Sequence, residues 1–138
     1  MSRGEVFALD PRLAADSTLI ADGPLSQVRL MDDARFPWLL LVPRVPGASE
    51  WIDLDGGQQR LLLAEINQVS QQLRAEPGVD KLNIGALGNI VRQLHVHLVG
   101  RHPGDPAWPG PVWGSGTARR HDPDTLAALA VRWRSRLG

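Results

Sequence analysis

Polar and apolar side chains alternate along the segment Gln93-Leu94-His95-Val96-His97-Leu98-Val99. Successive side chains of a β-strand point to opposite faces, so Gln93, His95 and His97 share one face and the aliphatic residues share the other. Polar groups left unpaired on a buried face would cost about 1 to 3 kcal/mol each. A plain solvent-facing strand would accept Lys, Thr or Glu equally well. The pattern therefore predicts a ligand pocket, with the two imidazoles roughly 6.5 to 7 Å apart along the strand.

Two imidazoles on one face are suited to phosphoryl chemistry. A free histidine has a pKa near 6.5, so at pH 7 most of it is neutral and able to attack an electrophilic phosphorus. The other ring nitrogen of the attacking histidine then needs an acceptor that fixes its tautomer. The second imidazole can hydrogen-bond phosphate oxygens or pass a proton to the leaving group, which is typically worth about 10² to 10⁴ in rate.

Four strands and three helices are predicted around this face. Apolar runs indicate strands, the first two forming a hairpin, over residues 27–31, 38–42, 81–85 and 91–99. Helices are expected over residues 7–16, from an Asp53 or Asp55 cap to about Ala75, and over about 123–137 after an Asp122-Pro123 start. Short antiparallel strands with a helix packed on one face predict an α+β fold, in a single domain over residues 1–138.

Residues 101–116 form an irregular segment rich in Pro and Gly, which do not suit helix interiors or central strands. Its two large rings, Trp108 and Trp113, are expected to pack on the core or on a partner subunit. Core positions are expected for Trp51, Trp133 and the apolar stripe Leu62, Ile66, Val69 and Leu73. Arg101 is expected to be a solvated strand-end residue, and His121 an exposed residue near a helix start.

Composition excludes several classes of function. The chain has 138 residues, no cysteine, and 15 basic against 15 acidic residues, so its formal net charge is zero. Without cysteine there are no disulfides, thiolate zinc sites or Cys nucleophiles. A neutral balance argues against nucleic acid or an anionic membrane as a partner. No secretory signal or spanning segment is apparent, so a cytoplasmic location is expected.

The motif and its surroundings resemble the histidine triad (HIT) family, whose motif is His-φ-His-φ-His-φ-φ with φ apolar. Gln93 stands where the family has its first histidine. The run from Pro37 to Arg44 resembles a family strand that ends in proline and a basic residue. Residues 81–85 resemble the strand that supplies an Asn, and Gly88-Asn89 resembles a turn near the phosphate. The likeness covers about residues 5–114, including a tail similar to that of a bacterial subgroup.

This resemblance implies a fold, a reaction and roles for named residues. The fold would be a HIT-like antiparallel β-meander with a helix packed on the sheet and a C-terminal helix, and the protein would be a homodimer. His95 would become transiently nucleotidylated and His97 would contact the phosphate, with no cofactor. The substrates would be nucleoside phosphoramidates, dinucleoside polyphosphates or related nucleotidyl compounds. The nucleotide-binding residues would be Gln93, Asn83, Asn89 and, for the ribose, Asp32 or Asp33.

Two other functions stay open at the level of the sequence. Gln93 cannot relay a proton, so one alternative is a non-catalytic nucleotide-binding or scaffold protein. The other is a metal-dependent hydrolase, because His-x-His pairs occur in zinc sites; zinc would need a third ligand from His102, His121 or a carboxylate. An amide at position 93 suits backbone hydrogen bonding as well as ligand contact, and Asn89 suits a turn as well as a phosphate site.

Overall fold

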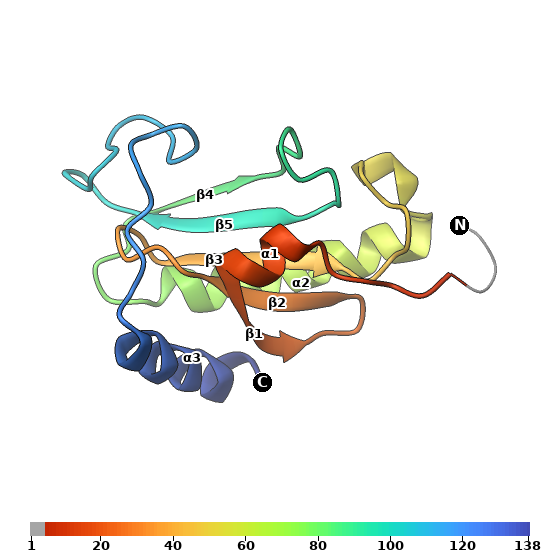
Figure 1. Cartoon of the computed structure of the whole chain (residues 1–138), viewed down its shortest axis with the longest axis horizontal. Coiled ribbons are helices and arrows are strands. Elements are labelled where there is room, and N and C mark those ends of the chain that lie inside the picture. Colours follow the sequence, from red (N-terminus) through yellow and green to blue (C-terminus); the bar gives the residue numbers. More distant parts are fainter. Residues whose placement is uncertain (1–4) are drawn as a thin grey trace.

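The computed structural model describes residues 5–138, so residues 1–4 of the predicted domain lie outside the described residues. The elements in chain order are α1 (Pro11–Asp16), β1 (Ser17–Asp22), β2 (Ser26–Met31), β3 (Trp38–Pro43), the 3-10 helix η1 (Trp51–Asp53), α2 (Gly56–Arg74), β4 (Lys81–Gly85), β5 (Val96–Arg101) and α3 (Pro123–Leu137). The strands form one sheet in the order β1-β2-β3-β5-β4 with antiparallel neighbours (Figure 1). The predicted α+β class is confirmed.

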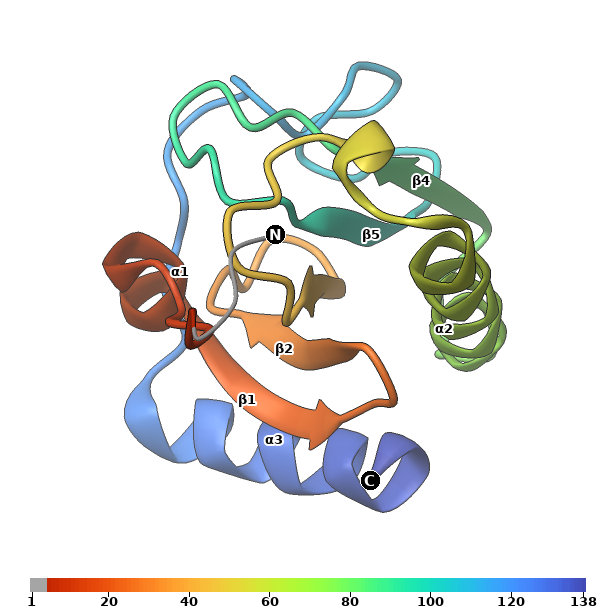
Figure 2. The same cartoon turned by 90° about the vertical axis from the view of Figure 1, so that its right-hand side faces the viewer.

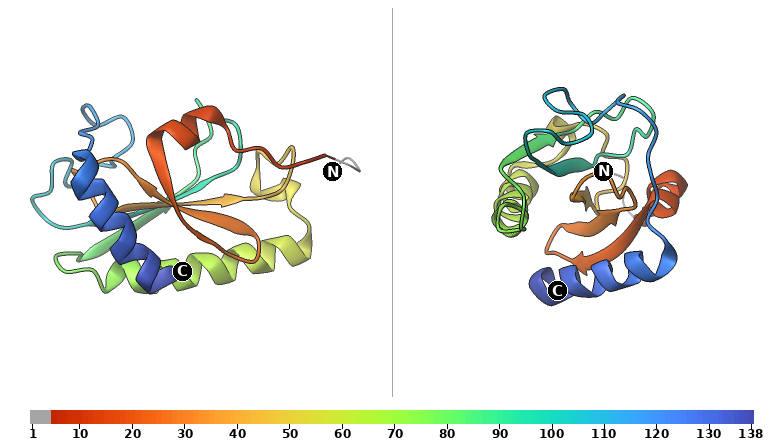
Figure 3. Two further views of the ribbon diagram at one scale, coloured as in Figure 1. Left: turned by 60° about the horizontal axis from the view of Figure 1, so that its bottom comes forward. Right: turned by 90° about the vertical axis from the view of Figure 1, so that its left-hand side faces the viewer.

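β3 is the central strand and is buried along its whole length. It pairs with β2 on one side, confirming the predicted hairpin, and with β5 on the other, where Leu40 lies opposite His97. Because its apolar side chains point to both faces, both faces must be covered. Helices α2 and α3 cover one face, and α1 lies on the opposite face from α2 (Figures 2 and 3). Val112 and Trp113 of the irregular segment also pack on the α1 face.

Helices α2 and α3 begin where the sequence predicts. The Asp55 carboxylate accepts a hydrogen bond from the backbone N–H of Gln58, and the Asp122 carboxylate accepts one from Thr125. Such caps satisfy N–H groups that have no partner within the helix. The predicted stripe on α2 faces the core, with Leu62, Val69 and Leu73 buried and Ile66 partly buried, and Trp133 of α3 is buried as predicted. None of the helices described over residues 5–138 combines the length and hydrophobicity that a bilayer crossing requires.

The strands near the site depart from the predicted boundaries. β1 was not predicted; it is an edge strand whose pairing with β2 is interrupted between Leu19 and Ala21, which breaks the alternation of side chains. The strand expected over residues 91–99 begins only at Val96, because residues 91–95 do not pair with β3 or β4. Helix α1 begins at Pro11 rather than at residue 7, because Asp10 caps it there.

Three side chains lie in surroundings other than those predicted. Trp51 is 42% exposed rather than in the core, because it lies on η1 and the neighbouring Leu54 fills the core instead. Arg101 is 1% exposed rather than solvated, because Asp105 forms an ion pair with it. The side chain of His121 is 10% exposed, because it packs against and hydrogen-bonds Asp32.

Candidate functional site

His95 and His97 lie together on the face of the sheet that α1 covers. His97 belongs to β5, and His95 comes directly before that strand. Their ring centroids are 4.8 Å apart in an edge-to-face arrangement, closer than the 6.5 to 7 Å of regular strand spacing. Both residues are buried. The intervening Leu94, Val96 and Leu98 belong to the core on the opposite face, as the alternation predicts.

A backbone carbonyl fixes the tautomer of His95. Nδ1 of His95 lies 2.7 Å from the carbonyl oxygen of Gln93. A carbonyl oxygen only accepts hydrogen bonds, so Nδ1 carries the proton and donates it. In the neutral ring the lone pair is therefore on Nε2, which is the form that can act as a nucleophile.

An indole fixes the opposite tautomer in His97. The N–H of Trp38 donates a hydrogen bond to Nδ1 of His97 over 3.1 Å. Because an indole nitrogen only donates, Nδ1 of His97 is unprotonated and the neutral ring carries its proton on Nε2. This ring can donate a hydrogen bond to a phosphate oxygen, but loss of the Nε2 proton would leave it anionic. Of the two roles that the sequence leaves open to the second imidazole, the geometry favours binding the phosphate over acid catalysis.

Burial keeps His97 neutral. Desolvation, followed by the charge of His95, lowers the pKa of His97 from 6.5 to about 3. Protonation would also place a proton on Nδ1 and break the hydrogen bond with Trp38. His97 is therefore a neutral donor throughout the physiological pH range.

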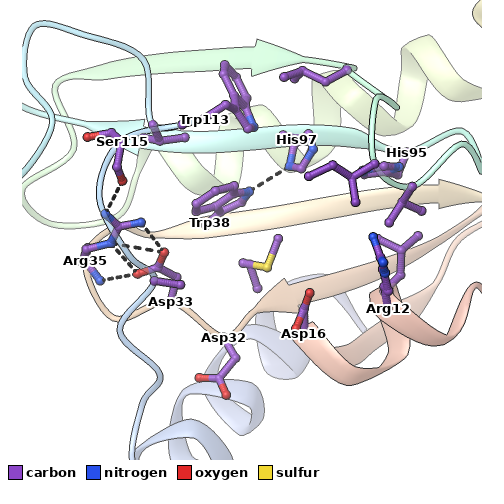
Figure 4. Close-up of a pocket in the computed structure, with 18 of the residues that line it drawn as sticks. Arg12, Asp16, Asp32, Asp33, Arg35, Trp38, His95, His97, Trp113 and Ser115 are labelled. Atoms are coloured by element: carbon purple, nitrogen blue, oxygen red, sulfur yellow. Dashed lines mark hydrogen bonds and ion pairs between the residues drawn. The ribbon is translucent and has the colours of Figure 1, made fainter.

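A cavity of about 590 Å³ opens beside the two imidazoles (Figure 4). Its size falls within the range of small-molecule sites, which is about 300 to 1,000 Å³. Its walls come from α1, the connection between β2 and β3, the turn over residues 87–91, and residues 112–120. Trp113 lies edge-on to His97 with ring centroids 5.5 Å apart, and its buried indole N–H has no partner within the described residues.

Comparison with known proteins identifies the family. The profile of the HIT domain matches residues 12–104 of the chain. The chain belongs to the HIT domain family. A comparison with curated proteins found no match.

Solved structures of HIT proteins superpose on most of the chain. A histidine triad protein from Bradyrhizobium japonicum is 47% identical over 97% of this chain and 100% of its own, with a TM-score of 0.91. One from Marinobacter aquaeolei is 41% identical over 96% of this chain and 97% of its own, with a TM-score of 0.92. The NitFhit protein of C. elegans, at 19% identity over 89% of this chain and 28% of its own, shares the fold with a TM-score of 0.68.

Asp32 and Asp33 both line the cavity of this HIT domain, and both are already engaged. Asp33 is 2% exposed, and both of its oxygens accept hydrogen bonds from the guanidinium of Arg35. Asp32 accepts from the backbone and ring of His121 through one oxygen, and from Arg120 through the other. These donors lower the pKa of both carboxyls despite burial, so both are ionised at neutral pH.

The remaining predicted nucleotide-binding residues separate into two groups. Asn89 lines the cavity beside Gly88, in a turn where Gly88 has a φ of 71°, a value that favours glycine. Asn83 and Gln93 do not line it. The side chain of Asn83 accepts a hydrogen bond from Arg101, and the side-chain amide of Gln93 bonds the backbone of residues 8 and 10.

Part of the cavity wall was not predicted because it lies far from the motif in sequence. Residues 112–120 are held against the β2–β3 connection by hydrogen bonds from Arg35 to the carbonyl of Ser115 and from the Ala34 N–H to the carbonyl of Arg119. Arg120 then forms ion pairs with Asp16 and Asp32. The sequence offers only a basic run, Arg119-Arg120-His121, and a distant acidic pair, Asp32-Asp33, as a signal of this pairing, and it does not specify partners.

The histidines of the HIT domain do not gather into a metal-binding cluster within the described residues. Over residues 5–138, no group of three or more His, Cys, Asp or Glu side chains is arranged to hold a metal ion. The Nδ1 atoms of the two motif histidines are occupied by the Gln93 carbonyl and the Trp38 indole. His102 hydrogen-bonds the carbonyl of Pro103, and His121 packs on Asp32, so neither of the two further histidines considered as ligands joins the pair.

Proposed function

We propose that this HIT protein is a nucleotidyl hydrolase or transferase that acts on the α-phosphate of a nucleotidyl substrate through a nucleotidyl-His95 intermediate. The observation that carries the proposal is the 2.7 Å hydrogen bond between Nδ1 of His95 and the Gln93 carbonyl, which leaves the lone pair on Nε2. The family resemblance supplies the substrate class, namely phosphoramidates and dinucleoside polyphosphates.

The reaction would take place in two steps. Nε2 of His95 attacks the α-phosphorus in line, a P–N bond forms, and the bond to the leaving group breaks with its electron pair. The ring is then cationic, and the Gln93 carbonyl stabilises it through Nδ1–H. Water next attacks the phosphorus, the P–N bond breaks, and its electron pair returns to Nε2 while the water proton passes to solvent. The leaving group takes its proton from solvent, because releasing the Nε2 proton of neutral His97 would leave an anionic ring.

His97 and Asp32 would hold the substrate during these steps. The Nε2–H of His97 donates to a non-bridging phosphate oxygen, where charge-assisted hydrogen bonds are strong. For the ribose we favour Asp32 over Asp33, because the Oδ2 atom of Asp32 accepts one hydrogen bond and an oxygen of this kind accommodates two. Asn89, which also lines the cavity, would contact the phosphates.

We also propose that the protein forms a homodimer, because the family resemblance implies one. β4 is an edge strand of the sheet and carries Ile84, which is 47% exposed. Unpaired strand edges are suited to association. Sedimentation equilibrium should show a dimer at micromolar concentration, and a monomer throughout would remove this part of the proposal.

The test of the enzyme is trapping of the intermediate. Adenosine 5′-phosphoramidate labelled in the phosphate should leave label on the wild-type protein in a single turnover, with chelator present and without acid quench. His95→Ala should show no label and no turnover. His102→Ala is the matched control, because His102 is exposed and away from the cavity, and it should behave as the wild type. Absence of label and turnover in the wild type, with AMP still bound, would favour the non-catalytic alternative.

A further inference from the structure

The side-chain amide of Gln93 binds the N-terminal segment with both of its ends. Its oxygen accepts a hydrogen bond from the N–H of Asp10 over 2.8 Å, and its nitrogen donates to the carbonyl of Ala8 over 2.9 Å. These partners are 83 and 85 residues away in the sequence. The residue that replaces the first motif histidine therefore joins the motif to the segment that precedes α1.

This segment sets the position of α1, which carries Arg12 to the cavity. Asp10 caps α1 by accepting a hydrogen bond from the N–H of Arg12, so the residue that Gln93 holds is also the one that starts the helix. Leu13 is buried in the core, which fixes the orientation of the helix. Arg12 itself is exposed and lines the cavity, at the end where Figure 4 places His95 and away from Arg35.

Arg12 is the cation of this cavity that is left unpaired. The three lining carboxylates are in ion pairs, Asp33 with Arg35, and Asp16 and Asp32 with Arg120. Within residues 5–138 the guanidinium of Arg12 makes no hydrogen bond or ion pair. A guanidinium with free donors at an open rim is suited to bind phosphate oxygens.

We propose that Arg12 binds the phosphates of the leaving group and that Gln93 is the positioning residue that holds Arg12 in place, so that the site prefers polyphosphate over uncharged leaving groups. This inference rests on the proposed function. The α-phosphate must sit at Nε2 of His95, where His97 holds its oxygens. Arg12 lies at the same end of the cavity as His95, so phosphates beyond the α-position that extend toward this rim would be within its reach.

A pair of substrates tests the role of Arg12. Diadenosine triphosphate releases ADP, whereas adenosine 5′-phosphoramidate releases ammonia. Arg12→Ala should lower kcat/KM about tenfold on the first substrate and less than twofold on the second, because one charge-assisted contact is lost. Arg12→Lys should restore part of the loss. Arg92→Ala is the matched control, since it removes the same charge from an exposed residue that does not line the cavity. Equal losses on both substrates with Arg12→Ala would overturn the assignment to the leaving group.

A double-mutant cycle tests the role of Gln93. Gln93→Ala should reproduce the substrate-selective loss, and Gln93→Ala with Arg12→Ala should be no worse than Arg12→Ala alone. Hydrogen exchange of residues 7–16 should become faster in Gln93→Ala. Additive losses, or equal losses on both substrates, would show that Gln93 acts only on the stability of the fold and would overturn its positioning role.

Equilibrium binding separates this inference from the proposed reaction. The α,β-methylene analogue of ATP should bind about tenfold more weakly to Arg12→Ala than to the wild type, and AMP should bind equally to both. If the wild type turns over neither substrate, the proposed reaction fails, but this binding comparison still decides the role of Arg12. An unchanged affinity for the ATP analogue would overturn it.

Discussion

The Trp38 indole donates to Nδ1 of His97 from a neighbouring strand, across 3.1 Å. The two side chains are brought together because Trp38 and His97 lie on the same face of β3 and β5, and Leu40 of β3 pairs with His97. This single contact decides which ring nitrogen of His97 carries the proton. It thereby makes a core tryptophan part of the candidate site.

Replacing Trp38 with Phe should remove the donor and keep an aromatic ring. His97 can then adopt either neutral tautomer, and we expect kcat to fall about tenfold, together with a loss of stability of about 1 to 3 kcal/mol. Nitrogen NMR of the imidazoles should show a single Nε2–H tautomer in the wild type and a mixture in the variant. Trp108→Phe, on a 38% exposed tryptophan outside the cavity, is the control. A variant that keeps the pure Nε2–H form would refute this reading of the contact.

Stability should depend on pH through His97. Its pKa is about 3 in the folded protein against 6.5 when unperturbed, so between these values the unfolded chain binds more protons. The free energy of unfolding should therefore fall as pH decreases from about 6.5 toward 3, by up to about 1.4 kcal/mol per pH unit from this residue. Urea titrations at a series of pH values give the free energy of unfolding of the wild type and of His97→Asn. Plotted against pH, the two free energies should differ in slope by this amount, because the contributions of the other titrating groups are common to both proteins. Parallel pH profiles would contradict the burial of a neutral ring.

The two acidic residues at the cavity should respond differently to loss of charge. Asp32→Asn should weaken binding of AMP several-fold and affect 2′-deoxy-AMP much less, if a ribose hydroxyl bonds Oδ2. Asp33→Asn should instead lower stability by about 1 to 3 kcal/mol, because Arg35 loses its ionised partner. Calorimetric binding and chemical denaturation of both variants measure the contrast. A selective loss of ribose discrimination in Asp33→Asn would reverse the assignment.

The pair Arg101 and Asp105 should matter for folding rather than for turnover. Nε and Nη2 of Arg101 donate to the two carboxylate oxygens over 2.7 and 2.9 Å, and both side chains are 1% exposed. These contacts hold the pKa of Asp105 below its ordinary value. Asp105→Ala leaves a buried guanidinium without a carboxylate and should cost about 3 to 5 kcal/mol. The double change Arg101→Met with Asp105→Leu should lower the free energy of unfolding by less than Asp105→Ala does, as measured by urea titration of both variants. An equal or larger loss of stability in the double variant would argue against the burial of an unpaired charge as the cause.

Local patterns predicted most of the fold because they reflect burial within one element. The continuous apolar run of β3 and the spaced stripe of α2 each identify a buried surface without reference to a partner. The edge strand β1 was missed, because its bulge breaks the pattern and only one side pairs. The alternation through residues 93–97 correctly separated the core face from the polar face, although the strand itself begins at Val96.

The site was predictable only as far as the motif. His95 and His97 stand out because polar groups recur on one strand face, whereas the roles of Gln93 and Asn83 depend on partners distant in sequence. Gln93 hydrogen-bonds the backbone of Ala8 and Asp10, and Asn83 hydrogen-bonds Arg101. The spacing of residues within one strand does not predict such contacts. Arg101 differs, because its partner Asp105 is only four residues further along; the sequence does not show that the turn between them buries the pair.

The family profile ends at residue 104, yet residues 112–120 form a wall of the cavity. During synthesis both imidazoles leave the ribosome before that wall exists. A nascent chain that has completed β5 therefore still lacks the part of the cavity wall that Trp113 and Arg120 provide. For the same reason, a fragment limited to residues 12–104 would retain His95 and His97 but would lack residues 112–120, which form part of the cavity wall.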